Sequence, residues 1–502
     1  MFMDKNSIVY LESVEKKFSG VYAVRGVDFS VAPGEVRCLA GENGCGKSTL
    51  IKMISGFYTP DGGKVYLNGY EYINLTPIEA IYNGIQVIYQ DFSLFPNLTV
   101  AENIAYSYLV SNNRKFFNKK EVKRIAKLGL SKINVNIDLD AVLSDLTVAD
   151  KQLVAIARSL VSDNIKLLVL DEPTTALTHS EVERLLDVIR ILKKDGVAII
   201  FVSHKLMELT SVSDSITIMR NGEVVANGSM KDFDEAKIVY YMTGREISDE
   251  KYILDNLEEA ETILEVKNMS LKDKYSDISF NLKKGEVLGI TGLLGSGRSE
   301  ISQSLFGMLP YDSGDIYFRG EKIKISNILD ARKYGIAYVP EDRLTEGLFL
   351  QQSIFNNIVV SVYNKFSNMF GILNKDLSYK HSLDKTKELK LNTTNLDMFV
   401  QNLSGGNQQK VVIAKWLISD PNLIILNSPT VGVDIGAKYE IHLKLKEIAK
   451  EGIGVIVISD DVSELLQNCN RILIIHKGKL VKELYSKDET MDSLSNALLM
   501  DY

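Results

Sequence analysis

The sequence predicts an α/β protein of two tandem domains, each with a mostly parallel core sheet, an antiparallel β part and a helical subdomain. One long stretch occurs twice, because "PGEVRCLAGENGCGKSTL" from Pro33 matches "KGEVLGITGLLGSGRSEI" from Lys284. Short apolar runs such as "KLLVL" are typical of parallel strands that are buried on both faces. Amphipathic segments that end at a glycine, such as "HSEVERLLDVIRILKKDG", alternate with these runs and are typical of helices.

The elements of the first half follow one another in a regular order. "VRCLA" predicts the first core strand and "STLIKMISG" the helix after it, and "KLLVL" and "VAIIFVS" predict two further core strands. "DSITIMRNGEVVANGS" predicts an antiparallel hairpin with Asn221 and Gly222 at its turn. The second half ends in the same way with "RILIIHKGKLVKELY". Residues 91–145 and 342–402 are the expected helical subdomains.

Four separate matches between the halves keep their order, which excludes a chance resemblance. Besides the stretch already quoted, "IQVIYQD" matches "IAYVPED", "LTVADKQ" matches "LSGGNQQ", and His204 aligns with Asp460. The sequence therefore predicts a first domain over residues 1–245 and a second over residues 262–502. Residues 246–261 are acidic and polar, as expected of a solvated linker.

Composition excludes several classes of protein. The chain has 502 residues, of which 45% are hydrophobic and 25% charged, as in globular proteins with more than one domain. Its net charge of −7 disfavours nucleic acid as a partner. The odd number of cysteines, 3, disfavours a disulfide framework and favours a reducing compartment. No apolar run reaches the roughly 18 residues of a membrane span, and the first residues are charged where a signal peptide is apolar.

A phosphate-binding loop is predicted in the first half. "GENGCGKST" fits the pattern G-x-x-x-x-G-K-[ST] between a strand and a helix, the context that this motif needs. The glycines let backbone N–H groups surround phosphates, Lys47 reaches the outer phosphates, and Ser48 ligates Mg²⁺. The motif predicts a P-loop NTPase. The expected nucleotide-binding residues in it are Gly41, Asn43, Gly44, Cys45, Gly46, Lys47, Ser48 and Thr49.

Further polar residues follow predicted strands of the first half. Asp171 ends "KLLVLD" and is expected to hold the Mg²⁺ shell, and Glu172 is expected to polarise an attacking water. Gln90 and His204 also follow apolar runs, so they are expected at the carboxyl edge of the sheet as catalytic groups, with Gln90 also near the metal. Phe18 precedes the first core strand and is expected to stack on the base, the alternative being an ordinary core position.

The motifs, in this order, resemble those of the ATP-binding subunits of ABC transporters over nearly the whole chain. Within that family, the tandem arrangement and the segments "PEDR" (340–343), "LSGGNQQK" (403–410) and "MTGRE" (242–246) resemble the sugar-import class for ribose, galactosides and xylose. "LFPNLTVAEN" is similar to a segment of the autoinducer-2 importers in that class. The resemblance implies ATP and Mg²⁺ as cofactors, and hydrolysis that drives uptake.

The resemblance also implies that the P-loop of one half works with the "LSGGN" signature of the other. The intact first-half motifs would then be completed by Ser404, Gly405 and Gly406, whose hydroxyl and N–H groups suit a γ-phosphate. Asp434 would reach the same nucleotide. The first half has Thr178 at the position of Asp434. We expect that only contact with the nucleotide at the first half's P-loop explains why residue 434 is acidic.

The other site would combine the P-loop of the second half with the signature of the first half, and it is altered at nearly every position. Only one hydrolytic site is therefore expected. In the second half, one acid pair and four other site residues are replaced: Arg298 stands for Lys47, Glu341 for Gln90, Asn427 and Ser428 for Asp171 and Glu172, Asp460 for His204, and Met269 for Phe18. The first half's signature reads "LTVAD", with Val148 and Ala149 at the glycine positions. Carboxylates at 341 and 460 would repel phosphates, whereas Arg298 keeps a positive charge, so nucleotide binding there stays open.

Partners and location follow from the resemblance. It implies a permease, paired as a dimer, and a sugar-binding receptor, with the chain at the cytoplasmic face of the cell membrane and in contact with it only through the permease. The sequence does not identify the sugar. The alternative from another class is a soluble tandem ABC ATPase that acts on ribosomes, which the altered second site and short linker disfavour.

Overall fold

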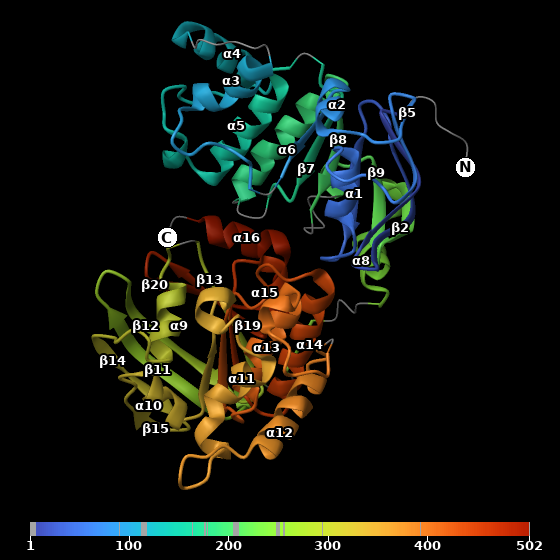
Figure 1. Cartoon of the computed structure of the whole chain (residues 1–502). Helices are drawn as coiled ribbons and strands as arrows, with labels where there is room; N and C mark the ends of the chain where they lie inside the picture. The colour runs from blue at the N-terminus through green and yellow to red at the C-terminus, as the bar shows by residue number, and fades with distance from the viewer. Residues whose placement is uncertain are drawn as a thin grey trace. The chain divides into compact units, whose positions relative to one another are not determined.

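The computed structural model describes the chain except residues 1–6, 90, 112–117, 163, 175–176, 178, 204–209, 247–250, 255–256, 294, 392 and 501–502. The chain forms two compact units, Met1–Ile247 and Ser248–Tyr502, here called unit 1 and unit 2 (Figure 1). Within the described residues, both units have the same two sheets in the same strand order.

Unit 1 contains a four-stranded antiparallel sheet and a six-stranded core sheet. The antiparallel sheet has the order β2-β1-β4-β5, and the core sheet the order β10-β9-β3-β8-β7-β6. Neighbouring core strands are parallel except β9 and β10. The strands are β1 (Val9–Phe18), β2 (Val21–Val31), β3 (Val36–Gly41), β4 (Gly62–Leu67), β5 (Tyr70–Tyr72), β6 (Ile85–Ile88), β7 (Leu167–Asp171), β8 (Ala198–Val202), β9 (Ser215–Arg220) and β10 (Glu223–Ser229).

The helices of unit 1 divide between the two sides of the core sheet. α1 packs with the antiparallel sheet, whereas α3, α4 and α5 form a helical subdomain on the other side (Figure 1). The helices are α1 (Lys47–Ile54), α2 (Pro77–Tyr82), α3 (Val100–Ser111), α4 (Lys119–Ser131), α5 (Val148–Leu160), α6 (His179–Lys194) and α8 (Glu235–Thr243).

Unit 2 repeats this arrangement, with sheet orders β12-β11-β14-β15 and β16-β17-β18-β13-β19-β20. Its strands are β11 (Thr262–Leu271), β12 (Tyr275–Lys283), β13 (Val287–Thr291), β14 (Ser313–Phe318), β15 (Glu321–Ile323), β16 (Ile336–Val339), β17 (Leu423–Asn427), β18 (Gly454–Ile458), β19 (Arg471–His476) and β20 (Lys479–Tyr485). Its helices are α9 (Arg298–Leu305), α10 (Ile328–Lys333), α11 (Ile354–Val359), α12 (Lys375–Glu388), α13 (Gly405–Leu417), α14 (Ile435–Lys450), α15 (Val462–Asn468) and α16 (Met491–Leu499).

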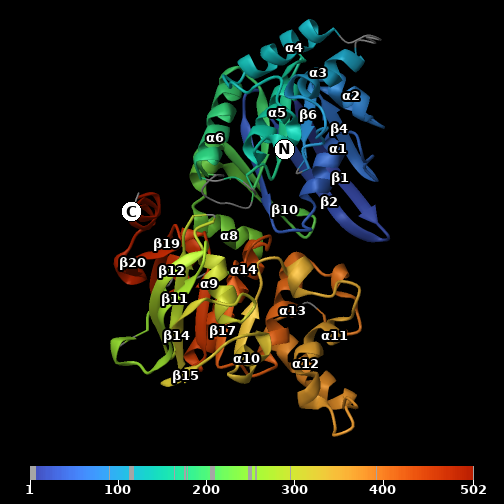
Figure 2. The ribbon, with the colours of Figure 1, turned by 90° about the vertical axis from the view of Figure 1, so that its left-hand side faces the viewer.

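The core sheet of unit 2 separates two hydrophobic clusters. Along β18, Val455 and Val457 belong to the cluster on the helical side, and Ile456 and Ile458 to the cluster beneath the antiparallel sheet. Figure 2 shows α11, α12 and α13 on the side of this sheet opposite β11, β12 and β14. A strand packed on both faces needs apolar residues at successive positions, which explains the continuous apolar runs of the core strands.

The predicted fold class is confirmed by these sheets. The antiparallel strands alternate between buried and exposed positions, as β12 does, whereas every residue of β8, β17 and β18 is buried. Among the described residues, no helix has the length and apolar character needed to cross a membrane.

A buried polar network ties the helices of unit 2 to the ends of its core strands. Glu464 of α15 accepts hydrogen bonds from Ser459 (2.6 Å) and Thr430 (3.0 Å), and its Oε1 lies 2.6 Å from Nε2 of His442 on α14. Burial alone would raise the pKa of Glu464, but the hydrogen bond and charge of His442, together with Lys438, lower it to about 2. The ionised carboxylate therefore stabilises the folded unit.

We predict that Glu464→Gln lowers the free energy of unfolding at neutral pH by about 3 kcal/mol, because it leaves buried partners unpaired. Because folding lowers the pKa of Glu464, its stabilising effect is fully present above pH 4.5, the ordinary pKa of a glutamate. The effect is lost as the pH falls toward about 2. Urea unfolding at neutral pH and at about pH 3 should therefore show a difference that shrinks in acid. Glu447→Gln, which removes an exposed pair with Lys444, is the control. Equal effects of the two substitutions at neutral pH would contradict the prediction.

Candidate active site

Three glycines shape the P-loop of unit 1, which connects β3 to α1. Gly41, Gly44 and Gly46 have φ angles of 148°, 80° and 108°, which few other residues adopt. A Cβ at Gly46 would lie 2.3 Å from the carbonyl oxygen of Ala23, and one at Gly41 would lie 2.4 Å from that of Met219. The backbone therefore curves tightly before a helix N-terminus, and this shape fits a phosphate group.

Lys47 begins α1, and the loop itself holds its ammonium group. Nζ donates hydrogen bonds to the carbonyl oxygens of Gly41 (2.7 Å) and Glu42 (2.9 Å), and the residue is 8% exposed. Sγ of Cys45 lies 3.9 Å from Nζ, and burial raises the pKa of this thiol. Lys47 thus supplies the positive charge of the loop, and Cys45 contributes a neutral side chain.

The two predicted carboxylates stand at the end of β7. Asp171 is its last residue and is paired with Val202 at the end of β8. Burial raises the pKa of Asp171, and the neighbouring charge of Glu172 raises it further, whereas Lys47 and Lys52 act against the rise. Glu172 and Lys47 thus both lie close enough to Asp171 to act on its charge, and the predicted roles of these residues stay predictions.

Glu172 has a left-handed backbone conformation, which no sequence pattern indicated. Its φ is 49°, and its N–H donates a hydrogen bond to the carbonyl oxygen of Val202 (2.9 Å). Such a conformation costs a non-glycine residue about 1–3 kcal/mol and is common at functional sites. Ser428 of unit 2 has φ 48° and donates in the same way to Ile458 (2.8 Å). The kink is therefore a property of the fold that both units keep.

Three predicted positions, Gln90, Thr178 and His204, lie outside the described residues. Phe18 ends β1 and is 42% exposed, with its ring in edge contact with Tyr58 at 5.2 Å between centroids. It is therefore a partly exposed aromatic residue rather than a core residue. Its stacking on a base stays a prediction.

The signature segment of unit 2 forms the start of α13. Ser404 caps this helix, accepting hydrogen bonds from the backbone N–H (3.4 Å) and the side-chain amide (3.0 Å) of Asn407. A Cβ at Gly405 would lie 2.9 Å from the carbonyl oxygen of Gly432, and one at Gly406 would lie 2.5 Å from Cβ of Ala437. Both glycines are thus required by close packing within unit 2.

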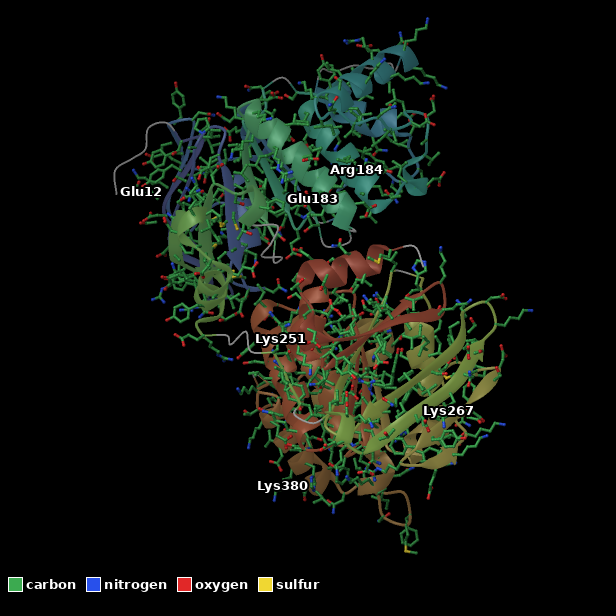
Figure 3. The ribbon with its side chains drawn as sticks, turned by 180° about the vertical axis from the view of Figure 1, so that it is seen from behind. Glu12, Glu183, Arg184, Lys251, Lys267 and Lys380 are labelled. Atoms are coloured by element: carbon green, nitrogen blue, oxygen red, sulfur yellow. The ribbon has the colours of Figure 1, made fainter. Side chains whose placement is uncertain are left out.

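The altered signature of unit 1 keeps its helix start. Thr147 caps α5 by accepting a hydrogen bond from the N–H of Asp150 (3.1 Å). Asp150 also lies 3.7 Å from Arg184 of α6, which Figure 3 labels. Val148 is 40% exposed and Ala149 is buried, so the replaced glycines changed the surface of this helix start and not its fold.

The expectation that only the opposite site explains Asp434 was wrong. Asp434 caps α14, because its Oδ1 accepts a hydrogen bond from the N–H of Ala437 (2.8 Å). An aspartate is among the best residues at this helix position. Its own unit therefore gives a sufficient reason for the acid, and its contact with nucleotide stays a prediction.

Arg298 and Asn427, two of the altered residues of unit 2, have polar contacts within their own unit. Arg298 donates a hydrogen bond to the carbonyl oxygen of Gly292 (2.7 Å) and lies 3.8 Å from the carboxylate of Asp460. The side-chain amide of Asn427 lies 3.4 Å from both the hydroxyl of Tyr338 and that of Ser299. Asp460 is thus partly neutralised by Arg298, and an amide has replaced the carboxylate that a metal would need.

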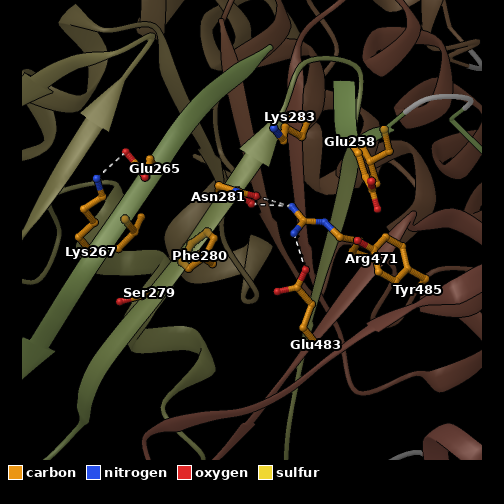
Figure 4. A pocket seen from close by; sticks show the side chains of 12 residues that line it. Glu258, Glu265, Lys267, Ser279, Phe280, Asn281, Lys283, Arg471, Glu483 and Tyr485 are labelled. Carbon is orange, nitrogen blue, oxygen red and sulfur yellow. Dashed lines mark hydrogen bonds and ion pairs between the residues drawn. The ribbon is translucent and has the colours of Figure 1, made fainter. Parts of the chain in front are cut away.

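A groove of about 550 Å³ in unit 2 contains none of these residues. It lies along β11 and β12 and is lined in part by Lys267, Asn281, Arg471 and Glu483 (Figure 4). Burial would lower the pKa of Arg471, but its hydrogen bond to Glu286 (2.6 Å), together with Glu483, raises it. The arginine is already paired, so it serves the packing of unit 2.

We predict that Mg²⁺-dependent nucleotide binding weakens in mild acid, because a metal needs the ionised carboxylate and burial raises the pKa of Asp171. The loss of binding should begin at a pH above 3.8, the ordinary pKa of an aspartate. Mg²⁺ titrations at about pH 7.5 and about pH 5 would measure it. Asp171→Asn should bind Mg²⁺ weakly at both pH values. A wild-type affinity that is the same at both would contradict the prediction.

Comparisons with known proteins show the family of the chain. The family model described as ABC transporter matches residues 24–175 and 275–431. A ribose import ATP-binding protein of Bacillus licheniformis is 38% identical over 97% of this chain and 98% of its own length. One of Clostridium tetani is 38% identical over 98% of this chain and 97% of its own length. A solved nucleotide-free ATP-binding cassette from an ABC transporter is 27% identical over 48% of this chain and 100% of that chain, with a TM-score of 0.42. The chain, with its two P-loop units, belongs to the ABC transporter family.

Proposed function

We propose that the chain is the ATP-hydrolysing subunit of an importer for ribose or a related sugar. The observation that carries this proposal is the intact group in unit 1, where Lys47 and Asp171 share one edge of the core sheet with Glu172. Two relatives that span nearly all of this chain are ribose import ATP-binding proteins, which supports a sugar as cargo.

The residues of unit 1 fit Mg²⁺ and ATP. The curve of the P-loop leaves no room for a Cβ at Gly41 or Gly46, as expected of a backbone that approaches phosphates closely. The hydroxyl of Ser48 and the carboxylate of Asp171 are hard oxygen donors, which Mg²⁺ prefers. When bound, Mg²⁺ and ATP supply the phosphoryl group that water attacks.

Each side chain then has one task. Lys47 donates its hydrogen bonds to phosphate oxygens in place of the carbonyl oxygens of Gly41 and Glu42. Glu172 accepts a hydrogen bond from the attacking water, and the left-handed backbone fixes the direction in which its carboxylate leaves the strand. Gln90 and His204 are proposed to act beside it on sequence alone.

Residues of unit 2 are proposed to complete this site, also on the sequence pattern. These are Ser404, Gly405, Gly406 and Asp434. A hydroxyl and N–H groups at the start of α13 would stabilise charge on the terminal phosphate. The second set of motifs, with Arg298 and Asn427, is proposed to lack hydrolysis.

The proposed partners are a permease pair in the membrane and a sugar-binding receptor, with the chain at the cytoplasmic face. Support comes from the relatives of Bacillus licheniformis and Clostridium tetani, which are ribose import ATP-binding proteins. The alternative, an ATPase that acts on ribosomes, gains no support from these relatives.

We predict that Glu172→Gln abolishes sugar-stimulated ATP hydrolysis and uptake, with a loss of about 10²–10⁴ in rate, because it removes the general base. The chain should be assayed with its permease and receptor, using a panel of labelled sugars that includes ribose. If the Glu172→Gln variant takes up every sugar whose import needs this chain as fast as the wild type does, Glu172 is not the general base.

We predict that restoring the acid pair, with Asn427→Asp and Ser428→Glu together, does not double the ATP hydrolysed per sugar imported. Arg298, Asp460 and the altered "LTVAD" segment still lack the groups that hydrolysis needs. The ratio of phosphate released to sugar imported would measure this. A doubled ratio would show that two sites can hydrolyse and would contradict the one-site proposal.

A further inference from the structure

A short π-helix in unit 2, Arg343–Gly347, follows β16 directly. Asp342 caps it, accepting hydrogen bonds from the N–H groups of Leu344 (2.9 Å) and Thr345 (3.2 Å). At its other end, Lys415 of α13 donates a hydrogen bond to the carbonyl oxygen of Gly347 (2.7 Å). The segment therefore has a defined shape and is tied to the helix that begins with the signature.

Arg343 connects this segment to the loop after β17. Its Nη1 donates a hydrogen bond to the carbonyl oxygen of Val431 (2.6 Å), and its Nη2 donates to that of Gly432 (3.2 Å). Within the described chain, its buried Nε has no hydrogen-bond partner. Two backbone oxygens of one loop thus orient the guanidinium, while its third nitrogen makes no hydrogen bond within the described chain.

The same guanidinium touches the first glycine of the signature. A Cβ at Gly405 would lie 2.8 Å from Nη2 of Arg343 and 2.9 Å from the carbonyl oxygen of Gly432. Two residues further on, Asp434 caps α14, and its Oδ2 would lie 3.1 Å from a Cβ at Gly406. The signature and the loop 431–434 therefore meet around one arginine head.

Unit 1 shares the helix anchor but not the arginine. Arg158 of α5 donates hydrogen bonds to the carbonyl oxygens of Phe92 (2.9 Å) and Ser93 (2.7 Å), as Lys415 does in unit 2 to Gly347. The residue aligned with Arg343 is Phe92, which has no charged group to donate. The arginine accompanies the intact signature and is missing where Val148 and Ala149 replace its glycines.

We propose that Arg343 is a positioning residue that holds the signature glycines and the loop 431–434 in the arrangement needed for hydrolysis. The inference rests on the proposed function, in which this signature serves the nucleotide. Arg343 acts through Gly405 and Gly432, so its loss should lower the rate of hydrolysis and leave nucleotide binding to Lys47 and Asp171 intact. It also links the segment after β16 to the signature, so a displacement of one is passed to the other.

The test compares Arg343→Ala, Arg343→Lys and the control Arg319→Ala in the full chain with its permease and receptor. Arg319 lies in unit 2 and donates a hydrogen bond to Asn422 (2.8 Å), outside the signature region. Three quantities are measured: kcat and KM for ATP, the Kd of an ATP analogue, and the urea midpoint of unfolding. Guanidinium at a few millimolar is then added to Arg343→Ala.

Arg343→Ala should lower kcat about 10–100-fold, since small displacements of positioned groups have effects of this size. Its Kd for the analogue should stay within about twofold, and added guanidinium should restore part of kcat. Arg343→Lys, which has a single point charge in place of the planar fork, should have an intermediate kcat. Arg319→Ala should behave as the wild type.

Two results would overturn the inference. One is an Arg343→Ala chain with wild-type kcat, and the other is a loss of kcat that parallels a lowered urea midpoint and is not restored by guanidinium. Glu172→Gln in the same assay separates the failure of this inference from that of the proposed function. If Glu172→Gln also hydrolyses ATP normally, the proposed function fails. If Glu172→Gln is defective and Arg343→Ala is normal, only the inference about Arg343 fails.

Discussion

Burial of the core sheet on both faces is the constraint on which each unit depends. Because the core strands are mostly apolar, polar side chains gather where these strands end, and parallel strands end at one edge. The P-loop after β3 and the acid pair at the end of β7 follow from this constraint in unit 1. In unit 2 the same edge holds Asn427 and Ser459, and Ser459 donates a hydrogen bond to Glu464.

The two units therefore share a backbone and differ in chemistry. Both have a left-handed residue directly after β7 or β17, at Glu172 and Ser428, and both hold it with a hydrogen bond to the neighbouring strand, β8 or β18. Lys47 and Arg298 each donate to carbonyl oxygens of their own loop. What differs is the side chains at these positions, which are Asp171 and Glu172 in unit 1 and Asn427 and Ser428 in unit 2. The two units thus keep the same main-chain geometry, and Arg298 and Asn427 have polar contacts within unit 2.

Much of the fold was predictable, because buried strands and P-loops leave patterns that are local in the sequence. The left-handed Glu172 was not, since it depends on a hydrogen bond to Val202 on a different strand. The contacts of Arg343 join residues 88 and 89 positions apart, and "PEDR" was recognised without any role for its arginine. The expectation for Asp434 was wrong for a different reason: a short acid before a predicted helix is a capping signal, and capping within its own unit is a sufficient reason for the acid.

The kink retained at Ser428 bears on how such a chain evolves. Because the backbone bend does not require a carboxylate, an ancestral acid at this position could be exchanged for serine by point substitution, with no rebuilding of the strand or its neighbours. Side chains at this position can therefore change one at a time while the strand and its neighbours keep their shape. A fold that carries its geometry in the main chain can thus vary the chemistry of one copy without passing through an unstable intermediate.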